Sequence, residues 1–357
     1  MTETLPVKSK NYAMNSADGP GRGRLLLRFL IAAGWWKVAG VIAAVVAGLM
    51  THGDWTDFTY RTTLLVLLLV GYSLMGMVLD GQDEPFRAMG FVRRATAWRE
   101  FGIGAALGWG LVVLAILPMA VMGAMRTTFW TEPRAFYLFG INLWTLAAAA
   151  LLEEVVFRGY PFQRLIQAIG PTGATVVMAI YFGYVHIHNT DASVTSFLVT
   201  ILAGVLLCVA YLRTHALWLP WGIHFAWNVS MGVLFGLPVS GLMDFNTIVQ
   251  TQTVGRPTLT GGAYGPEAAL ATFVVLVIGM VVLVRVTRDY AWEYTHAPIV
   301  AAGYEVEVAP PAAHVEMESK AAAAPAPLVQ IAASTSQAAS LHSKDLLPEL
   351  PKGPLGE

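Results

Sequence analysis

The feature that most constrains this chain is a series of apolar runs long enough to cross a lipid bilayer. A spanning helix needs about 20 mostly apolar residues, because lipid offers no hydrogen-bond partner to a free backbone amide or carbonyl. We therefore predict an all-α fold, a polytopic membrane bundle of about eight transmembrane helices in the lipid bilayer. The predicted spans lie at residues 29–50, 61–79, 101–123, 136–166, 172–190, 195–212, 217–236 and 268–287.

Composition supports lipid as the solvent of this chain. Charged residues make up 13% of it and apolar residues 56%, whereas a soluble domain is about 25% charged. An ordinary soluble enzyme and a fully disordered chain are excluded. The net charge of -1 offers no basic face for nucleic acid, so we expect no nucleic-acid partner. Cys208 is the single cysteine and cannot form an internal disulfide. The cysteine count therefore does not indicate whether the protein works in an oxidising or a reducing compartment.

The distribution of basic residues predicts the orientation of the spans. Cytoplasmic loops carry an excess of Lys and Arg, and the first run starts too late and is too long for a cleaved signal peptide. Both termini should therefore be cytoplasmic. The predicted cytoplasmic side carries Lys8, Lys10, Arg22, Arg24, Arg28, Arg87, Arg93, Arg94, Arg99, Arg158, Arg164, Arg213, Arg285 and Arg288, and the opposite side Arg61, Arg126, Arg134 and Arg256.

The two ends of the chain differ from its middle. Residues 1–23 are polar and rich in Gly and Asn, and residues 303–357 are rich in Ala, Pro and Ser without periodicity. Such segments cannot bury enough apolar surface to offset the entropy of ordering. We predict a disordered cytoplasmic N-terminus (1–23), a transmembrane domain (24–300) and a disordered cytoplasmic tail (303–357). The tail is either inert or a binding segment for a cytoplasmic partner.

Two acidic residues, Glu153 and Glu154, lie within an apolar run, in LLEEVVFRGY. Ionisable residues inside a membrane are costly and usually functional, although a pair of carboxylates at a helix end would be purely structural. Glu154 and Arg158 are one helical turn apart and can form an ion pair. Glu153 is rotated by about 100° and has no such partner in its own helix. It is the carboxylate free to face a cavity and to act as a general base.

Histidines provide the second signal. His186 lies four residues after Phe182, and His224 lies four residues before Asn228, so the latter pair shares one helix face. A histidine and an asparagine that both donate hydrogen bonds can stabilise an oxyanion. Each residue alone could instead be a polar contact between helices. His188 is either a further ligand or a loop residue, and His215 is expected in a short turn.

The ordered set of motifs resembles the CPBP intramembrane metalloprotease family, which includes the type II CAAX prenyl endopeptidases. The first motif is matched by Glu153, Glu154 and Arg158, the second by Phe182 and His186, and the third by His224 and Asn228. The resemblance covers residues 136–237. Each motif alone is weak, and the ordered set on separate spans is fairly specific.

The resemblance implies a catalytic mechanism. Glu153 and His186 would activate a water, and His224 and Asn228 would form an oxyanion hole. Glu153, His186 and His224 could alternatively supply the three protein ligands that are usual for a catalytic zinc. The chain has no HExxH sequence, and we favour the glutamate mechanism without a cofactor over one that uses Zn²⁺.

In a straight-helix arrangement, His186 would lie far from Glu153 and His224. The site then requires either a fourth span that continues to about Ile166, or a tilted or broken fifth span. Gly170 and Pro171 permit irregular backbone there.

Three functions compete. The leading interpretation is an intramembrane endopeptidase that cleaves a peptide or membrane-protein substrate, prenylated or not. The second is a non-catalytic membrane adaptor or immunity-type protein with the same fold. The third is a proton-coupled transporter that uses Glu153 and the histidines as a relay, although such proteins often contain an internal repeat, which we do not find here.

Overall fold

The computed structural model describes residues 20–245 and 247–288. All of them belong to one compact unit. The predicted disorder of residues 303–357, and of most of residues 1–23, concerns parts of the chain that the structure does not describe. The first helix begins at Arg22.

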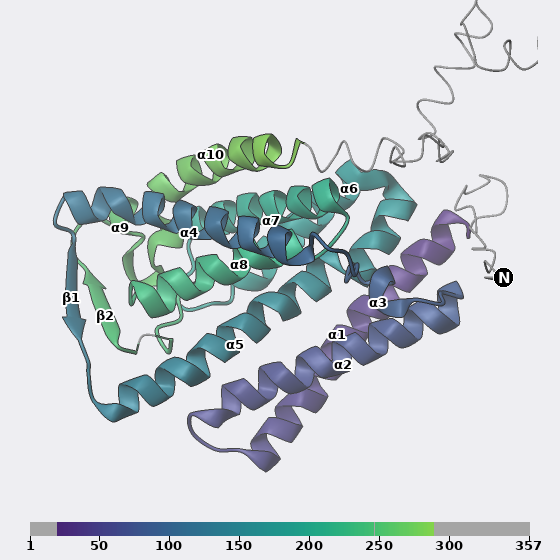
Figure 1. Ribbon diagram of the computed structural model, residues 1–357, viewed down its shortest axis with the longest axis horizontal. Helices are drawn as coiled ribbons and strands as arrows, with labels where there is room; N and C mark the ends of the chain where they lie inside the picture. The colour runs from purple at the N-terminus through teal and green to yellow at the C-terminus, as the bar shows by residue number, and fades with distance from the viewer. Residues whose placement is uncertain (1–19, 246, 289–357) are drawn as a thin grey trace, which may run out of the picture. The chain divides into compact units, whose positions relative to one another are not determined.

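Long helices dominate the described chain, as the apolar runs predict (Figure 1). A short helix, α3, connects the second and fourth helices, and another, α9, precedes the last. The helices are α1 (Arg22–Met50), α2 (Trp55–Asp80), α3 (Pro85–Ala88), α4 (Ala97–Val121), α5 (Pro133–Arg158), α6 (Tyr160–His186), α7 (Val194–Thr214), α8 (Trp218–Val229), α9 (Pro257–Thr260) and α10 (Leu270–Val286).

Five helical stretches are long and apolar enough to cross a membrane: Arg22–Met50, Trp55–Asp80, Ala97–Val121, Pro133–His186 and Val194–Thr214. Leu270–Val286 is a shorter apolar helix. These stretches make the chain a multi-pass membrane protein. The stretch Pro133–His186 contains both α5 and α6, and α8 has only 12 residues, so the predicted number of about eight spans remains an expectation.

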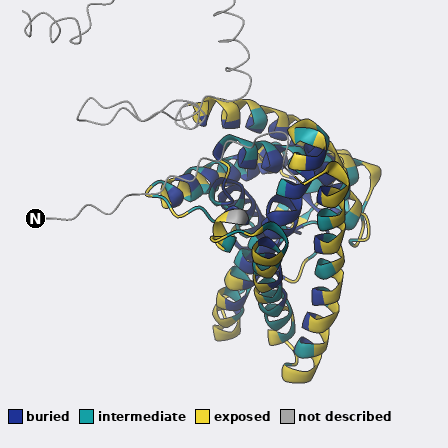
Figure 2. Ribbon diagram, turned by 90° about the vertical axis from the view of Figure 1, so that its right-hand side faces the viewer, coloured by how far each residue is buried: buried dark blue, intermediate teal, exposed yellow. Residues whose placement is uncertain are grey.

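The exposure of the long helices agrees with a membrane environment. In an apolar stretch of 18 residues, only 17% of α1 is buried, against 50% of α7. Figure 2 shows exposed positions along the outer sides of helices and buried positions where helices face one another. Large apolar side chains such as Leu49 and Val78 are almost four-fifths exposed, which is the surface that a helix presents to lipid.

The fourth and fifth predicted spans differ in detail from the helices. The helix α5 ends at Arg158 instead of continuing to Ile166, because Gly159 has non-helical backbone angles. The helix α6 then begins at Tyr160 and breaks at Gly170, whose φ of 81° lies in the left-handed region that favours glycine. The break at Gly170 thus lies between the predicted fourth and fifth spans and not inside the fifth, 172–190.

The described chain is not purely helical. Strands β1 (Met125–Phe129) and β2 (Val249–Thr253) pair antiparallel, with Met125 opposite Thr253. A π-helix, Ser230–Leu234, directly follows α8. The predicted all-α class therefore holds for the long elements and fails for this two-stranded ribbon, which the apolar runs do not reveal because its residues are mostly polar.

Close packing of α4 against α8 fixes the position of the third motif. A Cβ atom on Gly104 would lie 2.3 Å from the carbonyl oxygen of Leu219, and one on Gly108 would lie 2.3 Å from that of Ile223. From the other helix, a Cβ atom on Gly222 would lie 2.2 Å from the carbonyl oxygen of Phe101. Small residues spaced by four thus let the two backbones touch, as in many membrane helix pairs.

Candidate active site

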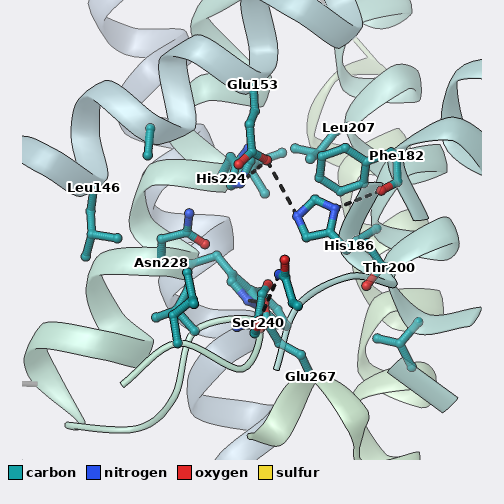
Figure 3. A pocket seen from close by; sticks show the side chains of 18 of the residues that line it. Leu146, Glu153, Phe182, His186, Thr200, Leu207, His224, Asn228, Ser240 and Glu267 are labelled. Atoms are coloured by element: carbon teal, nitrogen blue, oxygen red, sulfur yellow. Dashed lines mark hydrogen bonds and ion pairs between the residues drawn. The ribbon is translucent and has the colours of Figure 1, made fainter. Parts of the chain in front are cut away.

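Residues of all three motifs line one cavity of about 110 Å³. Glu153 comes from α5, His186 from the end of α6, and His224 and Asn228 from α8. Their side chains point toward a common space (Figure 3). Most of the remaining wall is apolar, including Leu146 and Leu207. A cavity of this volume has room for water beside the polar groups.

Glu153 lies opposite both histidines. Its Oε2 atom is 3.8 Å from His186 Nε2 and 3.6 Å from His224 Nε2. Glu153 Oε2 is buried and has no hydrogen-bond partner among the described residues. Both distances exceed that of a direct hydrogen bond. Polar atoms at such a separation are commonly bridged by a water.

The local backbone holds the ring of His186. Its Nδ1–H donates to the carbonyl oxygen of Phe182, at 2.7 Å, and the Phe182 ring packs on the imidazole with ring centroids 4.6 Å apart. Because Nδ1 carries the proton, Nε2 of the neutral ring presents a lone pair to the cavity. The four-residue spacing of the second motif therefore orients one specific nitrogen.

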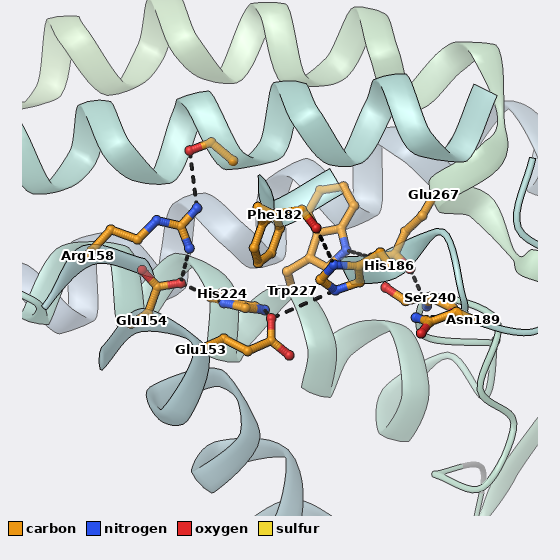
Figure 4. Close-up of polar contacts among 11 residues, drawn as sticks. Glu153, Glu154, Arg158, Phe182, His186, Asn189, His224, Trp227, Ser240 and Glu267 are labelled. Atoms are coloured by element: carbon orange, nitrogen blue, oxygen red, sulfur yellow. Dashed lines mark hydrogen bonds and ion pairs between the residues drawn. The ribbon is translucent and has the colours of Figure 1, made fainter. Parts of the chain in front are cut away.

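A buried ion pair holds the ring of His224. His224 Nδ1–H donates to Glu154 Oε1 at 2.7 Å, and Arg158 Nη1 donates to the same oxygen at 3.1 Å (Figure 4). Arg158 Nη2 also donates to the carbonyl oxygen of Gly204 in α7, at 3.1 Å. The side chains of Glu154 and Arg158 are fully buried. The ion pair expected from their spacing is thus present, and it extends to His224.

This arrangement limits what His224 can donate. Its Nδ1–H is already bound to Glu154, so a hydrogen bond from Nε2 into the cavity requires a second proton on the ring. A neutral ring bound in this way has no donor left for the cavity. The adjacent carboxylates of Glu153 and Glu154 are placed to balance the charge of an imidazolium.

Asn228 completes the group on α8. Its side chain is 8% exposed and faces the cavity (Figure 3). The amide forms no hydrogen bond with the other described residues, so its donors are free for a ligand. His224 and Asn228 line the same cavity from one helix face, as their spacing predicts.

The two other histidines that the sequence analysis singles out lie elsewhere. His188 is an exposed loop residue beyond α6 whose ring contacts Tyr184, and it does not line the cavity. His215 occupies the turn between α7 and α8 with a φ of 48°. Of the alternatives for His188, the structure has the loop residue.

Sequence reasoning missed the far wall of the cavity. Glu267 accepts a hydrogen bond from Trp227 Nε1 at 2.8 Å and another from the backbone amide of Ser240. Asn189 Nδ2 donates to the carbonyl oxygen of Ser240, at 2.9 Å. Glu267 stands one residue before the predicted span 268–287, so a search that includes the residues flanking each run would have found it. Ser240 and Asn189 carry no comparable signal, because only the loop fold brings them there.

The donor set resembles a zinc site in kind. Two imidazole Nε2 atoms face one carboxylate oxygen, and each Nδ1–H is bound to an acceptor behind it, as is usual for metal-binding histidines. Within residues 20–245 and 247–288, however, no group of three His, Cys, Asp or Glu is arranged to hold a metal ion.

Comparison with known proteins supports the resemblance in the sequence. Residues 134–230 match the family described as type II CAAX prenyl endopeptidase Rce1-like. The matched segment contains all three motifs and excludes the first three long helices, the β2 strand and Glu267. No curated protein and no solved structure matches the chain significantly.

Proposed function

Because residues 134–230 form a domain of the Rce1-like type II CAAX prenyl endopeptidase family, we propose that the protein is an intramembrane endopeptidase. Its substrate is a peptide or a membrane protein. The observation that carries the proposal is the convergence of Glu153 Oε2 and two imidazole Nε2 atoms in one membrane cavity. Peptide hydrolysis in a bilayer needs such a polar, water-holding space.

In this proposal, Glu153 and His186 position and activate the water. The water donates one hydrogen bond to Glu153 Oε2 and one to the lone pair of His186 Nε2. As the water oxygen attacks the peptide carbonyl carbon, Glu153 accepts its proton. The carbonyl π electrons move to the oxygen and form a tetrahedral oxyanion.

His224 and Asn228 then stabilise the oxyanion. The Nε2–H of the His224 imidazolium and the amide of Asn228 donate to it from one face of α8, and preorganised donors of this kind contribute about 3–4 kcal/mol each. When the carbon–nitrogen bond breaks, Glu153 returns the proton to the leaving amine. Glu154 and Arg158 do not touch the substrate and act by holding His224 in place.

The test is cleavage of a randomised peptide library by the purified protein in liposomes, read by mass spectrometry. Glu153→Gln keeps the shape of the side chain and removes the base, so we expect cleavage to fall by at least about a hundredfold. His188→Gln is the matched control, because this histidine lies outside the cavity, and it should retain activity. Full activity of Glu153→Gln would refute the role of Glu153.

A strong chelator separates the two water-activation chemistries. The glutamate mechanism predicts equal cleavage with and without the chelator, because no step needs a metal. Loss of cleavage that zinc restores would favour the metal alternative, in which Glu153, His186 and His224 move together to bind the ion.

A further inference from the structure

A second cavity, which we call the chamber, adjoins the candidate active site. It has a volume of about 750 Å³ and lies among α1, α2, α5 and the loop after the π-helix. Arg61, Leu242 and Phe245 line both the chamber and the active-site cavity. The two spaces therefore meet at these three residues.

The volumes of the two cavities suggest different roles. Sites for small organic ligands usually measure about 300–1,000 Å³. The active-site cavity, at about 110 Å³, can hold water and a scissile bond but not the rest of a peptide. The chamber, at about 750 Å³, has the volume that several peptide residues require.

The lining of the chamber fits a peptide. It combines small positions on α1, including Ala47 and Gly48, with polar side chains such as Thr56, Tyr60 and Asn142. Polar groups of this kind satisfy the backbone amides and carbonyls of an extended chain, which an apolar wall would leave unpaired.

The chamber also borders surface that water reaches. Asp57, which pairs with Arg61 at 2.7 Å, is 50% exposed. Arg134, which pairs with Asp54 at 3.0 Å, is 60% exposed. Ion pairs with such exposure belong to a hydrated boundary rather than to the lipid-facing surface. A polar peptide can thus enter the chamber without crossing lipid.

Arg61 marks the junction between the two spaces. Its Nε donates to Asp57, and neither terminal nitrogen donates a hydrogen bond to another described residue. Its guanidinium carbon lies 6.0 Å from the centroid of the Phe245 ring. These terminal nitrogens are therefore available to a carbonyl group of a chain that passes from the chamber to the cavity.

We propose that the chamber is a peptide-binding subsite that holds the substrate on one side of the scissile bond. The substrate chain then passes Arg61 and places the scissile bond beside Glu153. This proposal rests on the endopeptidase function and adds where the substrate binds. It also brings α1 and α2, which lie outside the family match, into substrate recognition.

Gly48 allows the chamber to be filled without disturbing the fold. A Cβ atom at Gly48 would meet no other atom within 4 Å, and the same is true of Gly34 on the same helix, which does not line the chamber. Gly48→Trp should therefore lower cleavage of the peptide library by about tenfold or more. Gly34→Trp, the matched control, should cleave at the wild-type rate, with both variants unfolding at similar temperatures. Equal cleavage by the two variants would overturn the chamber proposal and leave the endopeptidase function intact.

A binding measurement keeps the proposal testable even if the protein cleaves none of the peptides. Gly48→Cys introduces a thiol into the chamber, and the only native cysteine, Cys208, is fully buried. In a Glu153→Gln background, the peptide library should slow the reaction of the introduced thiol with a maleimide, whereas a thiol introduced by Gly34→Cys should react at an unchanged rate. Equal rates at Gly48→Cys with and without the library would refute the subsite.

Discussion

Two buried clusters of charged side chains in this protein contain similar residue types but differ in their relation to the candidate active site. The site cluster consists of Glu154, Arg158 and His224, which tie α5 to α8, with a further bond from Arg158 to α7. The Asp80 cluster consists of Arg28, Asp80 and Arg164, in which one carboxylate oxygen pairs with both arginines, at 2.5 and 3.1 Å. It ties α1 and α2 to α6.

The clusters differ in what stands next to them. In the site cluster, the side chains of Glu154 and Arg158 are fully buried, and His224 carries the arrangement into the cavity. In the Asp80 cluster, Arg28 is 20% exposed, and none of the three residues lines the active-site cavity or the chamber. Damage to the first should therefore affect stability and cleavage together, and damage to the second should affect stability alone.

The largest effect is expected for Arg158→Ala. This variant leaves the fully buried carboxylate of Glu154 with the His224 ring as its remaining partner, and breaking a buried ion pair costs about 3–5 kcal/mol. Glu154 also loses the arginine that fixes its carboxylate behind His224, so cleavage per folded molecule should fall. Thermal unfolding in detergent and peptide cleavage measure the two effects. Arg87→Ala is the control, because its pair with Glu84 is two-thirds exposed and should contribute less than about 1 kcal/mol.

An unchanged unfolding temperature for Arg158→Ala would break the comparison. It would mean that the ion pair between Arg158 and Glu154 does not stabilise the fold. Replacement of Glu154 by Gln would then also leave stability and cleavage unchanged.

A second way to disturb the site is to change the contact between α4 and α8. Gly108→Val places a side chain against the carbonyl oxygen of Ile223, 2.3 Å from the new Cβ atom, and forced overpacking costs about 1–3 kcal/mol. Because His224 follows Ile223, cleavage should fall as well. Gly110→Val is the matched control, since a Cβ atom there meets nothing within 4 Å. If both variants unfold and cleave alike, the close approach of the helices does not position the site.

The sequence predicts the site better than it predicts the surroundings. Glu153, Glu154 and Arg158 stand out because charge within an apolar run is rare, and helical spacing alone indicates which glutamate pairs. The break at Gly159 lies inside the predicted span 136–166, and hydropathy alone does not mark it, so the apolar runs locate the spans but misplace the end of α5. The polar strands β1 and β2 carry no apolar signal at all, and neither do Ser240 and Asn189.

The chamber illustrates the same limit. Its polar wall residues, including Asp54 and Asn142, are far apart in the chain and unremarkable one by one. Only the assembly of α1, α2 and α5 places them beside the cavity. In the sequence analysis, Arg61 is only one of the four basic residues on the side opposite the predicted cytoplasmic side. Nothing in its local sequence links it to Glu153.

A smaller effect is expected for Arg164→Ala in the Asp80 cluster. Asp80 keeps its ion pair with Arg28, so no charge is left unpaired, and we expect the loss of the ion pair between Arg164 and Asp80 to cost less than the about 3–5 kcal/mol of a broken buried pair. Thermal unfolding measures this loss. Cleavage per folded molecule should match the wild type, and a selective loss of cleavage would show that this cluster also controls the site.

The smallest effect concerns His215, a histidine that does not line the candidate active site. Partial burial and the nearby Arg94 guanidinium lower the pKa of His215 below its usual value of 6.5, so the folded protein favours the neutral ring. As the pH falls below 6.5, the unfolded chain binds a proton that the folded chain resists, and stability decreases until the lower pKa of the folded state is passed. His215→Asn keeps a residue type that tolerates the φ of 48° and removes this titration. Its unfolding temperature should therefore fall less than that of the wild type between pH 7 and pH 5. If His215→Asn and the wild type lose stability equally on acidification, other groups govern stability in this pH range. A change in cleavage at pH 7 would show that the turn between α7 and α8 affects the active site.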